Sequence, residues 1–487
     1  MVNGNLANSN DNLIASNVVI ANTPIKWCAV SLSDVVSRGK RIEASVFDVD
    51  SKQAYQRIKH CKYAPVPLIS PAGPVERAHY GGRLKRNYVN KLHEGAIGFI
   101  GSAEMLDINP QPIKYMIETD KVSNLKVSKG TVLMSRSGTI GNMTFVNRSL
   151  SKFLISEHAM RLECKEFPGY VYSYLKTHTG QLLIRSNIYG AVISQIEPEH
   201  IATIPIPDAP TDIKRRIDDL IKRSFDLRDE SNEMIDEATQ LLIDELQLPP
   251  ISELEGEQKD VNSFSVKLSD MKLRLDASYH LPIVDAITEH LKEYAAEVTT
   301  IGDKRISNDV ILPGRFKRVY VEDGYGRVFI GGKQLWELDP ENKKYLSLVH
   351  HGDRIAKQLE LHENMTLITC SGTIGKVALV GKQWENWTAN QHIIRVVPAN
   401  DDMAGYINIF LASDYGFQLI THHTYGSVVD EIDDNHVREI PIPLLKNQDV
   451  QQQINTLALE ANAKRYEAYL LEQEALRIMD EEVIYAK

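Results

Sequence analysis

The sequence predicts an α/β protein in which two strand-rich domains are separated by two long antiparallel coiled-coil helices, related by a pseudo-two-fold internal repeat. Three observations support this fold class. The chain of 487 residues repeats itself with a period of about 235 residues. Each copy consists mainly of short strand-like segments bounded by turn residues. Each copy ends in a long segment whose apolar residues follow a heptad spacing.

The repeat is a series of matching segments in the same order. The pentapeptide Ser-Gly-Thr-Ile-Gly occurs at residues 137–141 and again at 371–375, and the triplet Pro-Ile-Pro occurs at 205–207 and at 441–443. One pentapeptide can recur by chance, but a colinear series does not plausibly do so. The repeat therefore determines the architecture before any local structure is assigned.

The repeat and the changes in composition divide the chain into six segments. Asn-rich residues at the start and acidic residues between the copies are typical of flexible segments. The predicted segments are a flexible N-terminus (1–24), a first domain (25–208), a central spacer helix (209–248), an acidic linker (249–262), a second domain (263–446) and a C-terminal spacer helix (447–487).

The two helical segments each carry a coiled-coil seam, at alternating steps of four and three residues. The first helix leads from one domain to the other and the second can only lead back, so antiparallel pairing is expected. About 34 residues at about 1.5 Å each give a rod of roughly 50 Å. The alternative is two amphipathic helices that each pack on their own domain. The seam residues are Ile213, Ile217, Leu220, Leu227 and Leu241 in the first helix and Val450, Ile454, Leu457, Leu471 and Ile478 in the second.

The formal net charge of −10 does not exclude a nucleic acid as a partner. Residues 212–245 and 448–485, within the two helices, each carry a net charge of −5, so the rest of the chain is neutral overall. A neutral remainder leaves room for basic surfaces on the domains. Two similar domains about 50 Å apart would match two half-sites on a duplex, at roughly 15 base pairs.

The sequence also indicates the compartment. No apolar run approaches the roughly 20 residues of a membrane-spanning helix, and the start lacks the pattern of a signal peptide. The four cysteines, Cys28, Cys61, Cys164 and Cys370, lack the spacing of a zinc site or a disulfide framework. We expect a cytoplasmic protein that binds no metal and no membrane.

Candidate DNA-binding residues occupy matching positions in the two copies. Residues 83–86 and 315–318, within the matching segments 82–89 and 314–321, are predicted basic strands whose cations could neutralise phosphates, or simply form a solvated surface. The glycines of the repeated pentapeptide allow a close approach to DNA, or a tight structural turn. Arg136 beside the first pentapeptide could reach guanine in the major groove. The tyrosine of each Tyr-Gly pair could stack on or touch a base, or could pack inside the domain. These candidates are Arg83, Lys85, Arg86, Arg136, Ser137, Thr139 and Tyr189 in the first copy and Arg315, Lys317, Arg318, Ser371, Thr373 and Tyr425 in the second.

The sequence lacks the motifs that catalysis on DNA would need. It has no Gly-rich adenosylmethionine loop and no phosphate-binding P-loop, and residues 109–112 lack the aromatic of an amino-methyltransferase motif. Glu163 and Lys165 have the spacing of a nuclease pair, which the second copy does not repeat. His158 and His392 are equivalent and could suggest a paired catalytic or metal role, but hydrogen-bonded structural histidines are expected. No catalytic residue is predicted.

The repeated Ser-Gly-Thr-Ile-Gly turns, the Tyr-Gly segment leading to Pro-Ile-Pro and the helix after each copy resemble the specificity subunit of type I restriction-modification systems. The resemblance extends from about Ile25 to the end. It implies two target-recognition domains that each read half of a split double-stranded DNA sequence. It also implies helices that space the domains and dock two methyltransferase subunits, which a translocating restriction subunit can join. In such families S-adenosylmethionine is bound by the partner subunits and adenine is the usual target.

Two other classes of protein remain open from the sequence. One is a self-contained DNA methyltransferase or nuclease with a duplicated domain, and the other is a pseudo-dimeric DNA-binding repressor. The acidic connector at 253–260 and the Asn-rich start depart from the family pattern. They leave open whether the system is an orthodox type I enzyme or a related methylation-dependent defence system.

Overall fold

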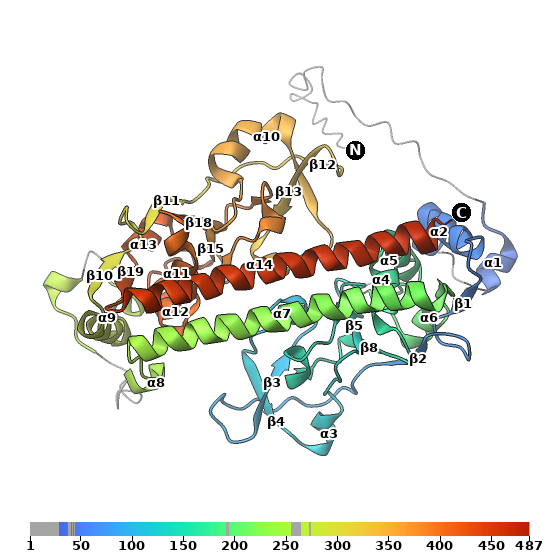
Figure 1. Ribbon diagram of the computed structural model, residues 1–487, viewed down its shortest axis with the longest axis horizontal. Coiled ribbons are helices and arrows are strands. Elements are labelled where there is room, and N and C mark those ends of the chain that lie inside the picture. The colour runs from blue at the N-terminus through green and yellow to red at the C-terminus, as the bar shows by residue number, and fades with distance from the viewer. Residues whose placement is uncertain are drawn as a thin grey trace, which may run out of the picture.

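The computed structural model describes the chain in seven parts, and the predicted N-terminus (1–24) and most of the predicted acidic linker lie outside them. The described residues are 29–37 with 40 and 42, 44–190, 194–254, 264–271 and 274–486. Two strand-rich domains lie on opposite sides of a pair of long helices (Figure 1). The helix after the first domain is α7 (Thr211–Glu245), and the helix after the second is α14 (Gln448–Ile478).

The first domain contains two main sheets and a short strand pair. The strand pair joins the beginning and the end of the domain, because β1 (Pro65–Pro67) pairs antiparallel with β9 (Pro205–Pro207). A four-stranded sheet has the order β2 (Val75–His79), β8 (Ala159–Cys164), β5 (Val132–Ser135) and β6 (Met143–Phe145). A three-stranded sheet has the order β4 (Lys114–Ile117), β3 (Ala96–Ile100) and β7 (Leu154–Ile155).

The second domain repeats this arrangement with one additional strand, β12, where the first domain has only the isolated Val89–Tyr115 bridge. Its terminal pair is β10 (Glu297–Thr300) with β19 (Pro441–Leu444). One four-stranded sheet has the order β11 (Ser307–Ile311), β18 (Ile393–Pro398), β15 (Thr366–Thr369) and β16 (Val377–Leu379). The other has the order β12 (Tyr320–Val321), β14 (Lys344–Ser347), β13 (Gly326–Ile330) and β17 (Thr388–Ala389). The sequence repeat is therefore also a repeat of strand pairing.

The shorter helices follow the same repeat. Thr177 and Ser413 cap equivalent helices, because each hydroxyl accepts a hydrogen bond from the backbone N–H of the glycine three residues later, at 3.1 Å. The first domain has α1 (Leu32–Ser37), α2 (Val49–Lys59), α3 (Asp120–Ser123), α4 (Pro168–Lys176), α5 (His178–Arg185) and α6 (Pro198–Ala202). The second has α9 (Pro282–Tyr294), α10 (Leu348–Arg354), α11 (Asp401–Ala412), α12 (Asp414–Thr421) and α13 (Asp434–Glu439), and α8 (Ile251–Leu254) follows α7.

The two long helices lie side by side and run in opposite directions (Figure 1). Near one end Arg216 forms an ion pair with Glu482 at 3.0 Å, and further along Lys464 forms one with Glu230 at 2.7 Å. Between them the Ser224 hydroxyl donates a hydrogen bond to a backbone carbonyl of α14, at 2.7 Å. Of the predicted seam residues, Ile217, Leu227, Ile454 and Ile478 are buried, while Ile213, Leu220, Leu241, Val450, Leu457 and Leu471 are half-buried.

Each domain core is completed by both helices. The first core includes Phe225 of α7 and Ala475 of α14, and the second includes Leu242 of α7 and Ala458 of α14. The seam therefore does not account for the whole buried surface, because each helix also turns a face toward a domain. Among the described residues, no helix is both long and apolar enough to cross a bilayer.

A glycine at an equivalent place in each domain allows close contact with a long helix. The backbone N–H of Gly169 donates to Asp218 of α7 at 2.7 Å, and that of Gly405 donates to Asn455 of α14 at 2.8 Å. A Cβ atom at Gly405 would lie 2.4 Å from the backbone oxygen of Asn455, which is too close for any side chain. The next residue is Tyr in both copies, and its hydroxyl donates to the last carbonyl of Pro-Ile-Pro.

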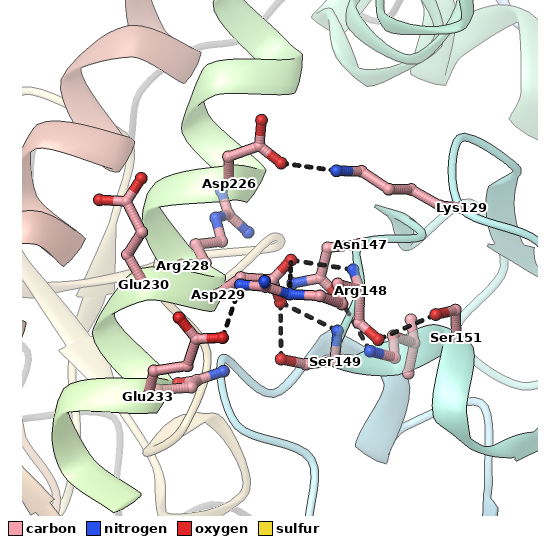
Figure 2. A network of polar contacts seen from close by, with 12 residues as sticks. Lys129, Asn147, Arg148, Ser149, Ser151, Asp226, Arg228, Asp229, Glu230 and Glu233 are labelled. Atoms are coloured by element: carbon pink, nitrogen blue, oxygen red, sulfur yellow. Dashed lines mark hydrogen bonds and ion pairs between the residues drawn. The ribbon is translucent and has the colours of Figure 1, made fainter. Parts of the chain in front are cut away.

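A polar network fixes the first domain along α7 (Figure 2). The buried carboxylate of Asp229 accepts hydrogen bonds from the backbone N–H groups of Arg148 and Ser149, both at 2.9 Å, and from the Ser149 hydroxyl at 2.6 Å. Arg148 also forms an ion pair with Glu233, one turn further along α7, at 2.7 Å. Hydrogen bonds to a charged buried acceptor are the stronger kind, so this network orients the domain on its helix.

Candidate nucleic-acid interface

The two basic segments connect the sheets of their domains. Residues 82–88 and 312–319 belong to no strand, so the predicted strands were wrong there. The physical reason is their position, since each segment leaves the edge of one sheet and crosses to the other, where no neighbouring strand is available. Pairing resumes at the Val89–Tyr115 bridge in the first copy and at β12 in the second.

In the first domain an arginine, two aromatic rings and a lysine form one cluster beside the basic segment. The Arg86 guanidinium lies over the Phe99 ring at 5.0 Å from its centroid. Phe99 meets Tyr88 edge to face at 6.2 Å, and the Lys114 ammonium lies 5.3 Å from the Tyr88 ring. Such contacts hold cations at a surface by packing as well as by charge.

The second domain contains the same cluster in the same order. Arg318 lies 5.5 Å from the Phe329 ring, Phe329 meets Tyr320 at 6.0 Å, and Lys344 lies 5.4 Å from the Tyr320 ring. We call these two sets the aromatic-cation clusters. Their agreement shows that the repeat preserves side-chain geometry at this surface and not only the backbone fold.

The cations of the basic segments differ in how far the protein itself neutralises them. Arg86 donates to both oxygens of Glu157, at 2.7 and 2.8 Å, whereas its counterpart Arg318 donates to neutral Gln391. Burial opposes the charge of Glu157, but the hydrogen bonds from Arg86 outweigh it and hold the pKa of this carboxyl below its ordinary value.

The fully exposed cations of these segments are the best placed to contact phosphate. Arg83, Lys85 and Lys317 are exposed, and among the described residues no carboxylate pairs with them. Arg315 is also exposed and forms an ion pair with Glu431 at 2.8 Å. A surface pair of this kind is weak and leaves the guanidinium free to exchange partners.

The repeated Ser-Gly-Thr-Ile-Gly turns present small residues to solvent beside these cations. Gly138 and Gly372 adopt φ angles of 77° and 76°, in the left-handed region that favours glycine. Thr139 and Thr373 are exposed on the turns. The serines are half-buried: Ser137 contacts the His158 ring nitrogen at 2.9 Å, and Ser371 bridges to Glu431 through the backbone.

Arg136 lies inside the first domain instead of facing solvent. Its side chain forms an ion pair with Glu197 at 2.5 Å and lies 4.0 Å from the centre of the Tyr80 ring, and the residue is only 3% exposed. Tyr189 donates to the same carboxylate at 2.6 Å. In this structure the Arg136 guanidinium and the Tyr189 hydroxyl are both engaged with Glu197 and are not available to a base edge. We therefore do not retain the expected contact of Arg136 with guanine.

The second copy differs at this position. Cys370 replaces Arg136 and is buried, and burial raises the pKa of its thiol to about 12. Tyr425, the counterpart of Tyr189, packs on the His436 ring at 5.5 Å and is 42% exposed. The turn regions therefore have different chemistry in the two domains, which is where two readers of different sequences would differ.

His158 and His392 lie in different domains. His158 contacts Ser137 and His392 contacts Gln391, so the structure does not bring the two histidines together as a pair.

A pocket of about 250 Å³ opens beside the first aromatic-cation cluster, with Arg86, Phe99 and Lys114 in its lining. The sequence did not predict it, because its walls come from four separate segments. Within the described parts of the chain, no group of three or more His, Cys, Asp or Glu side chains is placed to hold a metal ion.

Comparisons with known proteins find one family match and several similar solved structures. Residues 340–457 match the family model described as the type I restriction modification DNA specificity domain, and no curated protein matches. The structure is similar to a type I restriction-modification S subunit from M. genitalium (12% identity, 85% of this chain, 97% of that chain, TM-score 0.26). It is also similar to the HsdS subunit from Thermoanaerobacter tengcongensis (12% identity, 80% and 91%, TM-score 0.26).

The matched segment covers the C-terminal part of the second domain and the beginning of α14, and the first domain repeats the same strand order. Residues 340–457 are therefore similar to the DNA specificity domain of type I restriction-modification systems.

Proposed function

We propose that this subunit recognises a bipartite DNA target, with one half-site contacted by each domain, and directs two methyltransferase subunits to it. The duplicated aromatic-cation clusters carry the proposal, because two equal surfaces on one chain fit two separate stretches of one duplex. Exposed Arg83, Lys85 and Lys317 would neutralise phosphates and set the register of each domain.

The long helices act as an antiparallel coiled-coil spacer with a pseudo-two-fold axis at its centre. The 35 residues of α7 span roughly 52 Å at about 1.5 Å each, which corresponds to roughly 15 base pairs of B-DNA. The axis is supported by the cores, since each domain packs on the beginning of one helix and the end of the other. The net charge of −5 on each helical segment keeps the spacer away from the phosphates.

Sequence is read by the exposed residues of the turns, Thr139 in the first domain and Thr373 and Tyr425 in the second, which lie close to the phosphate-binding cations. The different residues at positions 136 and 370 give the two turns different chemical surroundings. S-adenosylmethionine is bound by the methyltransferase partners, and this chain supplies only the DNA sequence specificity. A restriction subunit joins the same assembly.

The spacer can be tested by inserting one heptad into α7 and one into α14 at matching positions. Seven residues lengthen a helix by about 10.5 Å, or roughly 3 base pairs. We expect methylome sequencing to show unchanged half-sites with a longer unread gap. An unchanged gap would contradict the spacer. An insertion of the same length in the segment between α7 and α8 is the control and leaves the gap unaltered.

A further inference from the structure

A residue of the second domain contacts the end of the repeated turn in the first domain. The Asn342 side chain donates a hydrogen bond to the side-chain oxygen of Asn142 at 3.2 Å, and it accepts one from Arg185 of α5 at 3.0 Å. Asn142 directly follows Gly141, the last residue of the first Ser-Gly-Thr-Ile-Gly turn. A side chain from the other half of the repeat therefore lies beside the turn to which we assign the first half-site.

Asn142 is one of the residues that close this turn. The Ser135 N–H donates to the Asn142 carbonyl at 2.8 Å, and the Gly141 N–H donates to the Ser135 carbonyl at 3.1 Å. The Ser135 hydroxyl also donates to the carbonyl of Thr139. The Gly141 carbonyl accepts a hydrogen bond from Gln181 of α5 at 3.0 Å. The position of exposed Thr139 therefore depends on contacts at the end of the turn, and the second domain supplies one of them.

The segment that carries Asn342 is anchored at the centre of the molecule. Leu338 is 3% exposed and belongs to one buried apolar cluster with Leu227 of α7 and Ala468 of α14. The next residue, Asp339, accepts a hydrogen bond from a glutamine side chain of α14 at 3.1 Å. A segment that is fixed on both long helices can hold Asn342 in one place against the first domain.

The link is formed in one direction only among the described residues that the repeat makes equivalent. The counterparts of Asn142, Arg185 and Asn342 are Lys376, Thr421 and Pro112. The Lys376 ammonium lies over the Trp336 ring of its own domain, at 4.2 Å from its centroid. The Pro112 side chain has no polar group with which to form a hydrogen bond. The first turn therefore depends on the second domain in a way that the second turn does not copy.

We infer that Asn342 is a positioning residue for the first domain: it holds the end of the first turn from the second domain, and so determines how strictly the first half-site is read. This inference rests on the proposed function for the role of the turn as a reader. Asn342 acts through Asn142 and contacts no base. The preferred bases are therefore still those of the first domain, and the strictness of the choice depends on the neighbouring domain.

The test measures the affinity of the assembled complex, this chain with its methyltransferase, for three duplexes by fluorescence anisotropy. One duplex carries the full target found by methylome sequencing, and each of the others has one base pair changed in one half-site. Thr139→Ala should lower discrimination at one half-site only, which identifies the half-site of the first domain. Asn342→Gly should lower discrimination at that same half-site by about threefold to tenfold, as the loss of one hydrogen bond predicts. It should leave discrimination at the other half-site unchanged.

Asn386→Gly is the matched control. Asn342 and Asn386 are both exposed residues of the second domain with left-handed backbone, at φ angles of 54° and 63°. Glycine accepts this backbone readily, so each change removes only a side chain. Asn386→Gly should alter neither half-site. Asn142→Ala combined with Asn342→Gly should lose no more discrimination than Asn142→Ala alone, because the two residues act through one contact.

Three outcomes would overturn the inference. Unchanged discrimination in Asn342→Gly, when Thr139→Ala does lower it, removes the positioning role and leaves the proposed function intact. Equal losses at both half-sites, or the same loss in Asn386→Gly, would show a general loosening of the chain instead of an effect on one turn. No effect of Thr139→Ala at either half-site contradicts the proposed role of the turn as a reader, and the role of Asn342 is lost with it.

Discussion

Asp107 of the first domain and Glu337 of the second form an antiparallel backbone bridge, and the two residues occupy equivalent places in the repeat, seven residues after Ile100 and Ile330. Beside them the Ile108 N–H donates to the Trp336 carbonyl at 2.8 Å. The domains therefore touch directly across the helix pair. Burial raises the pKa of both carboxyls to about 7. The nearby carboxyl of Asp107 raises the pKa of Glu337 further.

The contact between the domains should weaken as the pH rises. Both folded-state pKa values lie above the ordinary values of 3.8 and 4.5, so the folded state holds more protons than the unfolded state between about pH 4 and about pH 7. Stability from this site is present at low pH and is lost through that window. We expect the unfolding temperature to fall between about pH 4 and about pH 7, and the contribution of this site to level off at higher pH. Asp107→Asn with Glu337→Gln should flatten the dependence, and an equally steep fall in this variant would contradict the assignment.

Glu472 of α14 should be essential for folding. It is buried and accepts hydrogen bonds from Tyr172 and Lys176, both at 2.6 Å, and from Arg228. Burial opposes its charge, but Lys176 and Arg228 outweigh burial and lower its pKa to about 2. Glu472→Gln would leave two buried cations without a counter-charge, at a cost of about 3 to 5 kcal/mol in urea unfolding.

The matched control for Glu472 lies two residues further along α14. Glu474 forms an ion pair with Arg477 at 2.7 Å, and both side chains are exposed to solvent. Exposed pairs of this kind contribute little to stability, so Glu474→Gln should change it by less than about 1 kcal/mol. Equal losses for the two variants would show that the buried cluster is unimportant.

Gly405→Ala should loosen the second domain from α14. The added methyl would meet the Asn455 carbonyl oxygen at 2.4 Å and the Ala458 side chain at 2.9 Å, so the helices must separate. Overpacking of this kind costs about 1 to 3 kcal/mol. Gly82→Ala is the control because no atom lies within 4 Å of the added group. Chemical denaturation of both variants checks the difference, and a stable Gly405→Ala chain would contradict the close approach.

Removing the exposed cations should weaken DNA binding without changing the sequence that is recognised. Arg83→Ala with Lys85→Ala removes two charges at the proposed phosphate surface. Each lost phosphate contact lowers the salt dependence of log affinity by about 0.9. Fluorescence anisotropy of the assembled complex at several salt concentrations measures this, with Lys292→Ala on α9 as the control. A changed target sequence with an unchanged salt slope would show that these residues contact bases.

The sequence was sufficient to predict the parts of the fold that depend on local periodicity. The heptad spacing predicted two long helices, and the repeat predicted that both domains share one strand order. The seam residues describe only part of the buried surface, because Phe225 and Asp229 of α7 face the first domain and interrupt the heptad pattern. Periodicity alone cannot distinguish a helix that packs on one partner from a helix that packs on two.

The candidate site was harder to predict, because its side chains are neutralised by residues distant in the chain. From the sequence, Arg136 is a candidate for contact with a base, and only the fold shows that it forms an ion pair with Glu197. The aromatic-cation clusters could have been found, since each basic segment is followed by a matching phenylalanine, Phe99 at 13 residues after Arg86 and Phe329 at 11 residues after Arg318. The contact of Asp107 with Glu337 joins different domains, and neither segment has a pattern that predicts the other.

Exchange of the two domains tests the account most directly. A chain in which residues 65–207 and 297–444 change places keeps both helices and both terminal strand pairs. Methylome sequencing of cells that carry this chain with its methyltransferase should show the two half-sites in exchanged order with the same gap between them. An unchanged target, or a target unrelated to either half-site, would contradict the claim that each domain reads its own half.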